Sequence, residues 1–125
     1  MIKGIGVDIV DIDRMDAALK RHQGLMERLF TQSECDYCLA RKRPQLHFAA
    51  RFAAKEAALK ALGTGLRRVR WRDLEVCRDK WGRPFLRLNG QAGDLARDKG
   101  ICDVYISLSF NRQSAVASAI AIGVE

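Results

Sequence analysis

The stretch QLHFAARFAAKEAALKALG, residues 45–63, decides the fold. Its alanines, leucines and lysines favour a helix, and Gly63 follows them as a helix stop. We therefore expect a long helix over residues 45–62. On that helix Glu56 lies about 40° from Phe52, which marks the apolar stripe. A carboxylate in this position costs free energy unless it is paired or holds a metal.

A strand is expected over residues 2–10, at the start of the chain. Ile5, Val7 and Ile9 alternate with smaller residues and therefore share one face. The opposite face carries Gly4 and Gly6 and ends at Asp8. Because glycine lets a helix or ligand approach the backbone closely, we expect the Asp8 carboxylate at the mouth of this space.

The rest of the chain mixes helical and strand patterns, so we expect an α+β fold in one domain over residues 1–125. Thr31 and Glu34 match a capping box, and a polar turn at residues 79–82 separates two alternating segments. The predicted elements are a helix over 13–30, a helix from Thr31 until the polar stretch before Pro44, a hairpin over 72–88, a helix over 90–100, and strands over 103–110 and 114–122.

Composition limits the kinds of partner. A net charge of +7 favours an acidic partner, whether nucleic acid, phosphorylated cofactor or acidic protein. The chain has no apolar run of the roughly 18 residues that span a bilayer, and its start reaches acidic residues by Asp8, unlike a secretory signal. We therefore expect no membrane segment and a cytoplasmic location, where the four cysteines stay free thiols.

Asp8 and Glu56 form the candidate metal site. Two carboxylates from separate elements suit Mg²⁺, which completes its octahedron with water and substrate phosphate. The alternative is that Glu56 only pairs with Lys60, one helical turn further on. The turn Gly63, Thr64 and Gly65 has two interpretations as well: its amides approach a phosphate, or it is a helix C-cap.

Two groups of arginines are candidates for binding acidic partners. Arg14, Arg21 and Arg28 are spaced by seven, which on one helix gives a basic ridge able to bind carboxylates or phosphates, or else a solvated face. The run RRVRWR at residues 67–72 suggests single-stranded nucleic acid stacking on tryptophan. No recognised nucleic-acid motif accompanies that run, so we expect no nucleic-acid partner.

Three segments together resemble the holo-acyl-carrier-protein synthases of the 4'-phosphopantetheinyl transferase superfamily. They are GVDIVDIDR at 6–14, RFAAKEAALKALGTG at 51–65 and ISLS at 106–109. The resemblance implies an antiparallel sheet packed against a long helix, and a homotrimer with active sites between subunits. It also implies transfer of 4'-phosphopantetheine from coenzyme A to a serine of an acidic apo-acyl carrier protein, releasing adenosine 3',5'-bisphosphate, in support of fatty acid biosynthesis.

The resemblance also assigns roles to residues. Asp8 and Glu56 would bind Mg²⁺, and Lys60 would be the active-site lysine that stabilises phosphate oxygens. Glu56, acting through a water, is our candidate for the base that deprotonates the serine. Coenzyme A would be bound by Arg51, Gly63, Thr64, Gly65 and Ser109. Arg14 would dock the acidic helix of the carrier, and Arg21 and Arg28 extend the same ridge by their helical spacing.

The chain departs from the family pattern at Phe110. Many relatives have a histidine there that contacts the nucleotide end of coenzyme A, so this contact must be absent or replaced, by stacking or by Asn111 and Arg112. An inactive protein that still binds coenzyme A or the carrier is therefore an alternative to the enzyme.

Overall fold

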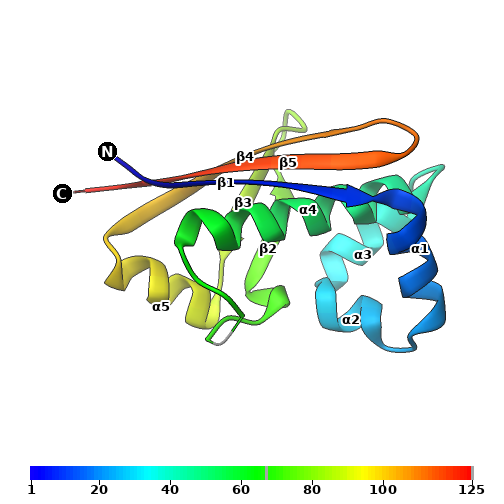
Figure 1. Cartoon of the computed structure of the whole chain (residues 1–125), viewed down its shortest axis with the longest axis horizontal. Helices are drawn as coiled ribbons and strands as arrows, with labels where there is room; N and C mark the ends of the chain where they lie inside the picture. Colours follow the sequence, from blue (N-terminus) through cyan, green and yellow to red (C-terminus); the bar gives the residue numbers. More distant parts are fainter. Residues whose placement is uncertain (67, 125) are drawn as a thin grey trace.

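A three-stranded antiparallel sheet carries the fold, and a computed structural model describes it for residues 1–66 and 68–124. The strand order is β1 (Ile2–Asp11), β5 (Ser114–Gly123) and β4 (Ile101–Phe110). The long helix α4 (Pro44–Leu62) packs along one face of this sheet (Figure 1). The predictions of an α+β fold, of these strands and of the long helix are confirmed, with small shifts at their ends.

The glycine face of β1 lies directly against α4. A Cβ atom at Gly6 would lie 2.0 Å from the carbonyl oxygen of Ala57, and one at Gly4 would lie 2.0 Å from that of Ala61. Any larger residue would push the strand off the helix. The glycines thus fix the distance at which the next residue on this face, Asp8, meets α4.

The two faces of the sheet differ in composition and exposure. Toward α4, β5 presents the buried residues Ala115, Ala117, Ala119 and Ala121. Helices α1 to α5 lie on this side of the sheet (Figure 1). The other face carries large apolar side chains that are 38% to 70% exposed: Ile5, Val7, Ile9, Tyr105, Val116 and Ile120.

The N-terminal helical region differs from the prediction. Instead of one helix over 13–30, α1 (Ile12–Arg21) and α2 (Leu25–Leu29) are separated at Gly24, whose φ of 84° is left-handed and ends helical continuity. The N-cap of α1 is Asp11. The capping box is confirmed, since Thr31 and Glu34 start α3 (Gln32–Leu39). As predicted, α3 ends where the polar stretch before Pro44 begins.

The predicted hairpin and the helix after it are also present. A short 3-10 turn, η1 (Trp71–Asp73), leads into β2 (Leu74–Arg78), which pairs with β3 (Pro84–Leu88). Helix α5 (Gly90–Asp98) then returns the chain to β4. No helix among the described residues is long and apolar enough to cross a membrane.

Two clusters of buried apolar residues make up the core, and α4 contributes to both. One lies between α4, the sheet and the hairpin, and the other joins α4 to α1, α2 and α3. Sharing one helix between the two clusters favours a single domain. The assignment of residues 1–125 to one domain stays a prediction.

Candidate active site

Asp8, Glu56 and Lys60 lie at one place on the contact between β1 and α4. Lys60 Nζ donates to Asp8 Oδ1 at 3.1 Å and to the Val7 carbonyl oxygen at 3.0 Å. The Asp8 side chain is 15% exposed and that of Lys60 is 55% exposed. Among the described ion pairs, Lys60 pairs with Asp8 and not with Glu56. The simple helical pair is therefore not what this structure contains.

The electrostatics of Glu56 are set by burial and by a second carboxylate. Burial raises the pKa of Glu56, the negative charge of Asp8 and a hydrogen bond between the two carboxyl groups raise it further, and Lys60 opposes these effects. A carboxyl group with a raised pKa can take up a proton closer to neutrality. Two facing carboxylates that share one lysine also attract a cation.

The donor set at this site fits Mg²⁺. This ion commonly binds one or two protein carboxylates and keeps its other positions for water and substrate phosphate. Among the described residues, no cluster of three or more His, Cys, Asp or Glu side chains forms a complete protein cage. Asp8 and Glu56 therefore suit an ion shared with a phosphorylated substrate.

The turn after α4 is a helix C-cap. Gly63 has a φ of 70°, its amide donates to the Lys60 carbonyl oxygen at 3.1 Å, and the Thr64 amide donates to that of Leu59 at 3.2 Å. Lys99 Nζ binds the Leu62 carbonyl oxygen at 2.6 Å. Since these amides are used by the helix, a phosphate at this turn would have to bind Gly65 or the Thr64 hydroxyl.

Arg51 does not lie on an open face of α4. It is 1% exposed, and its guanidinium carbon lies 4.0 Å from the centroid of the Tyr37 ring. Its Nε atom is buried with no hydrogen-bond partner among the described residues. At five residues from Glu56, Arg51 lies about 140° round the helix, so the two side chains leave α4 on different sides.

Ser109 is separated from the carboxylates by the sheet. In the register of β4 and β5 it lies beside Val116, on the exposed apolar face, whereas Asp8 lies on the face toward α4. Phe110, the last residue of β4, is 41% exposed and contacts the ring of His47. Within one chain, Ser109 and Asp8 therefore do not belong to the same surface.

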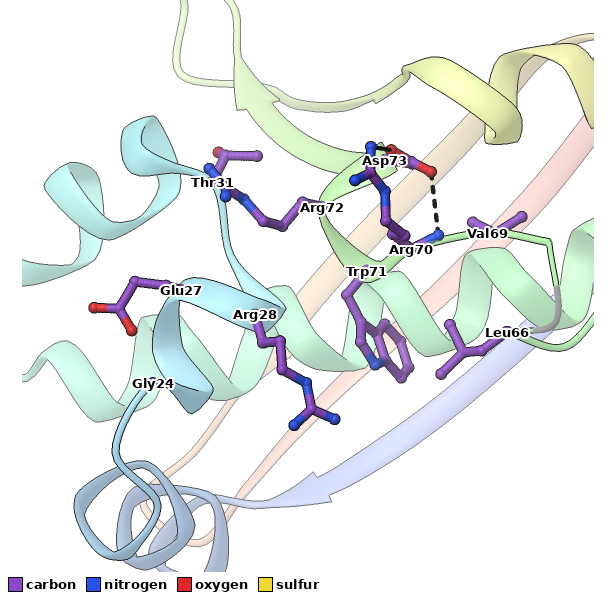
Figure 2. Close-up of a pocket in the computed structure, with 10 residues that line it drawn as sticks. All are labelled: Gly24, Glu27, Arg28, Thr31, Leu66, Val69, Arg70, Trp71, Arg72 and Asp73. Atoms are coloured by element: carbon purple, nitrogen blue, oxygen red, sulfur yellow. Dashed lines mark hydrogen bonds and ion pairs between the residues drawn. The ribbon is translucent and has the colours of Figure 1, made fainter.

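The predicted ridge of three arginines is split between two helices. Arg14 and Arg21 are exposed on α1, and Arg28 is exposed on α2 beyond the break at Gly24. Arg28 lines a pocket of about 690 Å³ together with Leu66 and Trp71 (Figure 2). The pocket thus combines an apolar wall with basic side chains.

The basic run at residues 67–72 has mostly structural contacts. Arg67 lies outside the described residues, Val69 is buried, and Arg70 lies 3.6 Å from Asp73. The Trp71 ring packs on Phe52 with centroids 5.0 Å apart. A tryptophan packed in this way is a poor platform for stacking bases.

Several charged residues of the fold escape sequence reasoning. Lys55 and Glu34 form a buried ion pair at 2.7 Å, and Arg41 and Arg78 lie beside the Tyr37 ring. For Lys55 a signal was present, since Arg51, Lys55 and Phe48 share one side of a helix at spacings of three and four. For Arg41 and Arg78 there was none, because they come from elements far apart in sequence.

Residues 4–113 match the family described as the 4'-phosphopantetheinyl transferase superfamily. The chain belongs to this superfamily. Within it, the chain is 48% identical to the holo-[acyl-carrier-protein] synthase of Moorella thermoacetica, over 92% of this chain and 90% of that one. It is 44% identical to the enzyme of the same name from Alkaliphilus oremlandii, over 98% and 100% of the two chains.

Solved structures of holo-acyl-carrier-protein synthases have the same fold. The enzyme from Neisseria meningitidis superposes with a TM-score of 0.89 at 33% identity, covering 98% of this chain and 99% of that one. The enzyme from Bacillus anthracis, solved in complex with CoA (3',5'-ADP), superposes with a TM-score of 0.82 at 34% identity, covering 99% of each chain. The predicted family and fold class are thereby confirmed.

Proposed function

We propose that this protein transfers 4'-phosphopantetheine from coenzyme A to a serine of apo-acyl carrier protein, with Mg²⁺ bound by Asp8 and Glu56. The observation that carries the proposal is the meeting of Asp8, Glu56 and Lys60 at the β1–α4 contact. Membership of the superfamily supplies the class of reaction. We include in the same proposal that the protein acts in fatty acid biosynthesis and is located in the cytoplasm.

The chain supplies positioning and charge for this reaction. Phosphoryl transfer depends mostly on alignment and electrostatic stabilisation. Mg²⁺, when bound, would act as a Lewis acid on the pyrophosphate. Lys60, whose ammonium group donates to Asp8 Oδ1 at 3.1 Å, would donate to the phosphate oxygens of the bound substrate. Glu56 would accept the serine proton through a water.

The same proposal gives the carrier a docking surface formed by Arg14, Arg21 and Arg28. All three are exposed, and Arg28 borders the pocket lined by Leu66 and Trp71 (Figure 2). Acidic side chains would meet the arginines while an apolar side chain enters the pocket. Changing each arginine to glutamate should raise the KM for the carrier more than that for coenzyme A. Equal effects on both constants would contradict the docking role.

We also propose that the protein is a homotrimer through the open face of the sheet. The exposed residues Ile5, Val7, Ile9 and Ile120 form a continuous apolar surface across neighbouring strands, and such surfaces mark interfaces. A second copy is the favoured occupant because Ser109 and Arg51 lie away from Asp8 within one chain. If one coenzyme A molecule bound between two copies, Ser109 and Arg51 of one copy would contact the same ligand as Asp8 of the other. Val7→Glu should lower both the molecular mass by light scattering and the transfer rate.

The deciding experiment is mass spectrometry of apo-acyl carrier protein incubated with this protein and coenzyme A. One sample contains Mg²⁺, and a matched sample contains EDTA. A mass gain of one phosphopantetheine group only in the Mg²⁺ sample is expected. A gain in both samples would overturn the metal requirement. No gain with any of several carriers, from a folded protein, would favour the inactive coenzyme A-binding alternative.

A further inference from the structure

Phe110 has a histidine partner in this fold. The His47 ring, on the first turn of α4, lies 5.3 Å from the Phe110 ring, centroid to centroid, at an interplanar angle of 75°. On its other side it lies 5.8 Å from the Tyr37 ring at 77°. The phenylalanine at the family's histidine position therefore touches an imidazole that comes from another element.

The His47 ring also has an unused polar atom. Nδ1 is buried and has no hydrogen-bond partner among the described residues. Burial lowers the pKa of His47, and the charges of Arg51, Arg41 and Arg78 lower it further. A neutral imidazole with a free nitrogen needs a partner, because an unsatisfied buried polar group costs free energy.

Three guanidinium groups gather at the same place. Measured from the guanidinium carbon to the centroid of the Tyr37 ring, Arg41 and Arg51 lie at 4.0 Å and Arg78 at 4.9 Å. None of the three forms an ion pair with a carboxylate among the described residues. Among the residues that the structure describes, Arg51 donates only a long hydrogen bond of 3.5 Å, to the His47 carbonyl oxygen.

The cluster of three guanidinium groups around Tyr37 is suited to binding an anion. Cation–π contacts with one tyrosine offset only part of the repulsion among three like charges and of the cost of burying Arg51. A phosphate group accepts several guanidinium hydrogen bonds at once and carries the opposite charge. The buried Arg51 Nε and His47 Nδ1, neither with a partner, indicate where such a group would bind.

We propose that His47 supplies, from α4, the imidazole that the family resemblance leads us to expect at position 110, and that with Arg41, Arg51 and Arg78 it binds the ribose 3'-phosphate of coenzyme A. The inference rests on the proposed function. Coenzyme A carries two separate anionic groups, a pyrophosphate and a 3'-phosphate. The pyrophosphate belongs at Asp8 and Glu56, so a second cluster of positive charge suits the 3'-phosphate. Phe110 then packs against the imidazole and orients it.

Exchange of the two residues tests the role of His47. The variants are His47→Phe, and the double variant His47→Phe with Phe110→His, which returns the histidine to the strand. For each, calorimetry gives the Kd for coenzyme A and for dephospho-coenzyme A, which lacks the 3'-phosphate. Steady-state kinetics gives the KM for each donor and for the carrier.

A distinct pattern is expected. His47→Phe should weaken binding of coenzyme A by about tenfold, the value of one hydrogen bond to a charged group, and leave dephospho-coenzyme A and the KM for the carrier unchanged. The double variant should regain most of the loss. Arg78→Gln, at an exposed position, should reduce the preference for coenzyme A without affecting folding.

Other patterns would overturn the inference. Equal losses for both donors would mean that His47 acts through the fold, and a raised KM for the carrier alone would mean that the anion is a carboxylate of that partner. If His47→Phe fails to fold, an unchanged donor preference in Arg78→Gln contradicts the site. Absence of transfer by the wild-type protein would refute the proposed function but leave the binding comparison intact.

Discussion

Two lysines of α4, Lys55 and Lys60, each form an ion pair, but one pair is buried and the other is partly exposed. Lys55 and Glu34 are both fully buried, and Lys55 Nζ has three acceptors: Glu34 Oε1 at 2.7 Å, the Leu29 carbonyl oxygen at 2.8 Å and that of Trp71 at 3.1 Å. Every proton of the ammonium group is used. Lys60 is more than half exposed, and its pair with Asp8 is longer, at 3.1 Å.

The difference separates a structural pair from the pair at the proposed active site. Glu34 also accepts from the amides of Thr31 at 2.8 Å and Val76 at 2.9 Å, so the pair joins α2, α3, α4, η1 and β2. Next to the Lys60–Asp8 pair lies a second carboxylate, Glu56. Its partial burial and the negative charge of Asp8 raise its pKa. Charges that are completely satisfied hold a fold, whereas incompletely satisfied ones are available for a ligand.

The largest effect is expected at the buried pair. Lys55→Met should lower the free energy of unfolding by about 3–5 kcal/mol, because it leaves the Glu34 carboxylate buried without its cation. Urea denaturation measures the change. The matched control is Lys55→Met with Glu34→Gln, which removes the stranded charge and should recover part of the loss. A double variant no more stable than the single one would contradict the electrostatic explanation.

Glu56→Gln should show the reverse balance of activity and stability. We expect transfer to fall at least about a hundredfold, which corresponds to roughly 2.7 kcal/mol of transition-state stabilisation, while the protein keeps or gains stability because a carboxylate facing Asp8 is gone. The carrier mass assay and urea denaturation measure the two effects. Retained activity in both Glu56→Gln and Asp8→Asn would remove the proposed metal site.

The pH dependence of stability should report the same carboxylate. The pKa of Glu56 is higher in the folded protein than in the unfolded chain. Above the pKa of a glutamate in the unfolded chain, the folded protein therefore still holds a proton that the unfolded chain has lost. The stability that Glu56 contributes is therefore fully present below the pKa of the unfolded chain, and it declines as pH rises through the folded-state pKa. In EDTA, the wild-type protein should lose stability relative to Glu56→Gln over this range.

Addition of Mg²⁺ should reverse that decline. An ion that binds only the folded protein stabilises it by about 2.7 kcal/mol at a hundredfold excess over its Kd. It should do so only where Glu56 is ionised, and much less in Glu56→Gln. A Mg²⁺ effect of equal size in both proteins would place the ion elsewhere.

Local patterns in the sequence were enough for most of the elements, but they did not predict that Lys60 pairs with Asp8. The helix stop at Gly63, the capping box at Thr31 and the glycine face of β1 are short-range signals, and the structure has all three. The break at Gly24 was missed, because apolar spacing continues across it. A single glycine in a helical pattern does not reveal whether it adopts a left-handed φ.

Charged residues on the inner side of α4 show where sequence reasoning ends. The helical spacing of Arg51 and Lys55 with Phe48 indicates an inward side of α4. It does not identify their partners, Glu34 and Tyr37, which belong to α3. Pairing of this kind depends on how α3 docks, which no local spacing encodes. The side of the sheet on which Ser109 lies relative to Asp8 likewise follows from strand register, not from the ISLS motif.

The smallest effect should come from Lys60, and it tests the contrast between the two lysines most closely. Lys60→Met should change the free energy of unfolding by less than about 1 kcal/mol, because an exposed pair contributes little. The property that Lys60→Met should change is the pKa of Glu56. Without the nearby ammonium, which lowers the Glu56 pKa, that pKa should rise, and the stability decline of the apo protein should move to higher pH. Glu56→Gln in the Lys60→Met background should abolish the shift. A loss of stability as large as that of Lys55→Met would show that both pairs hold the fold, and the distinction between them would fail.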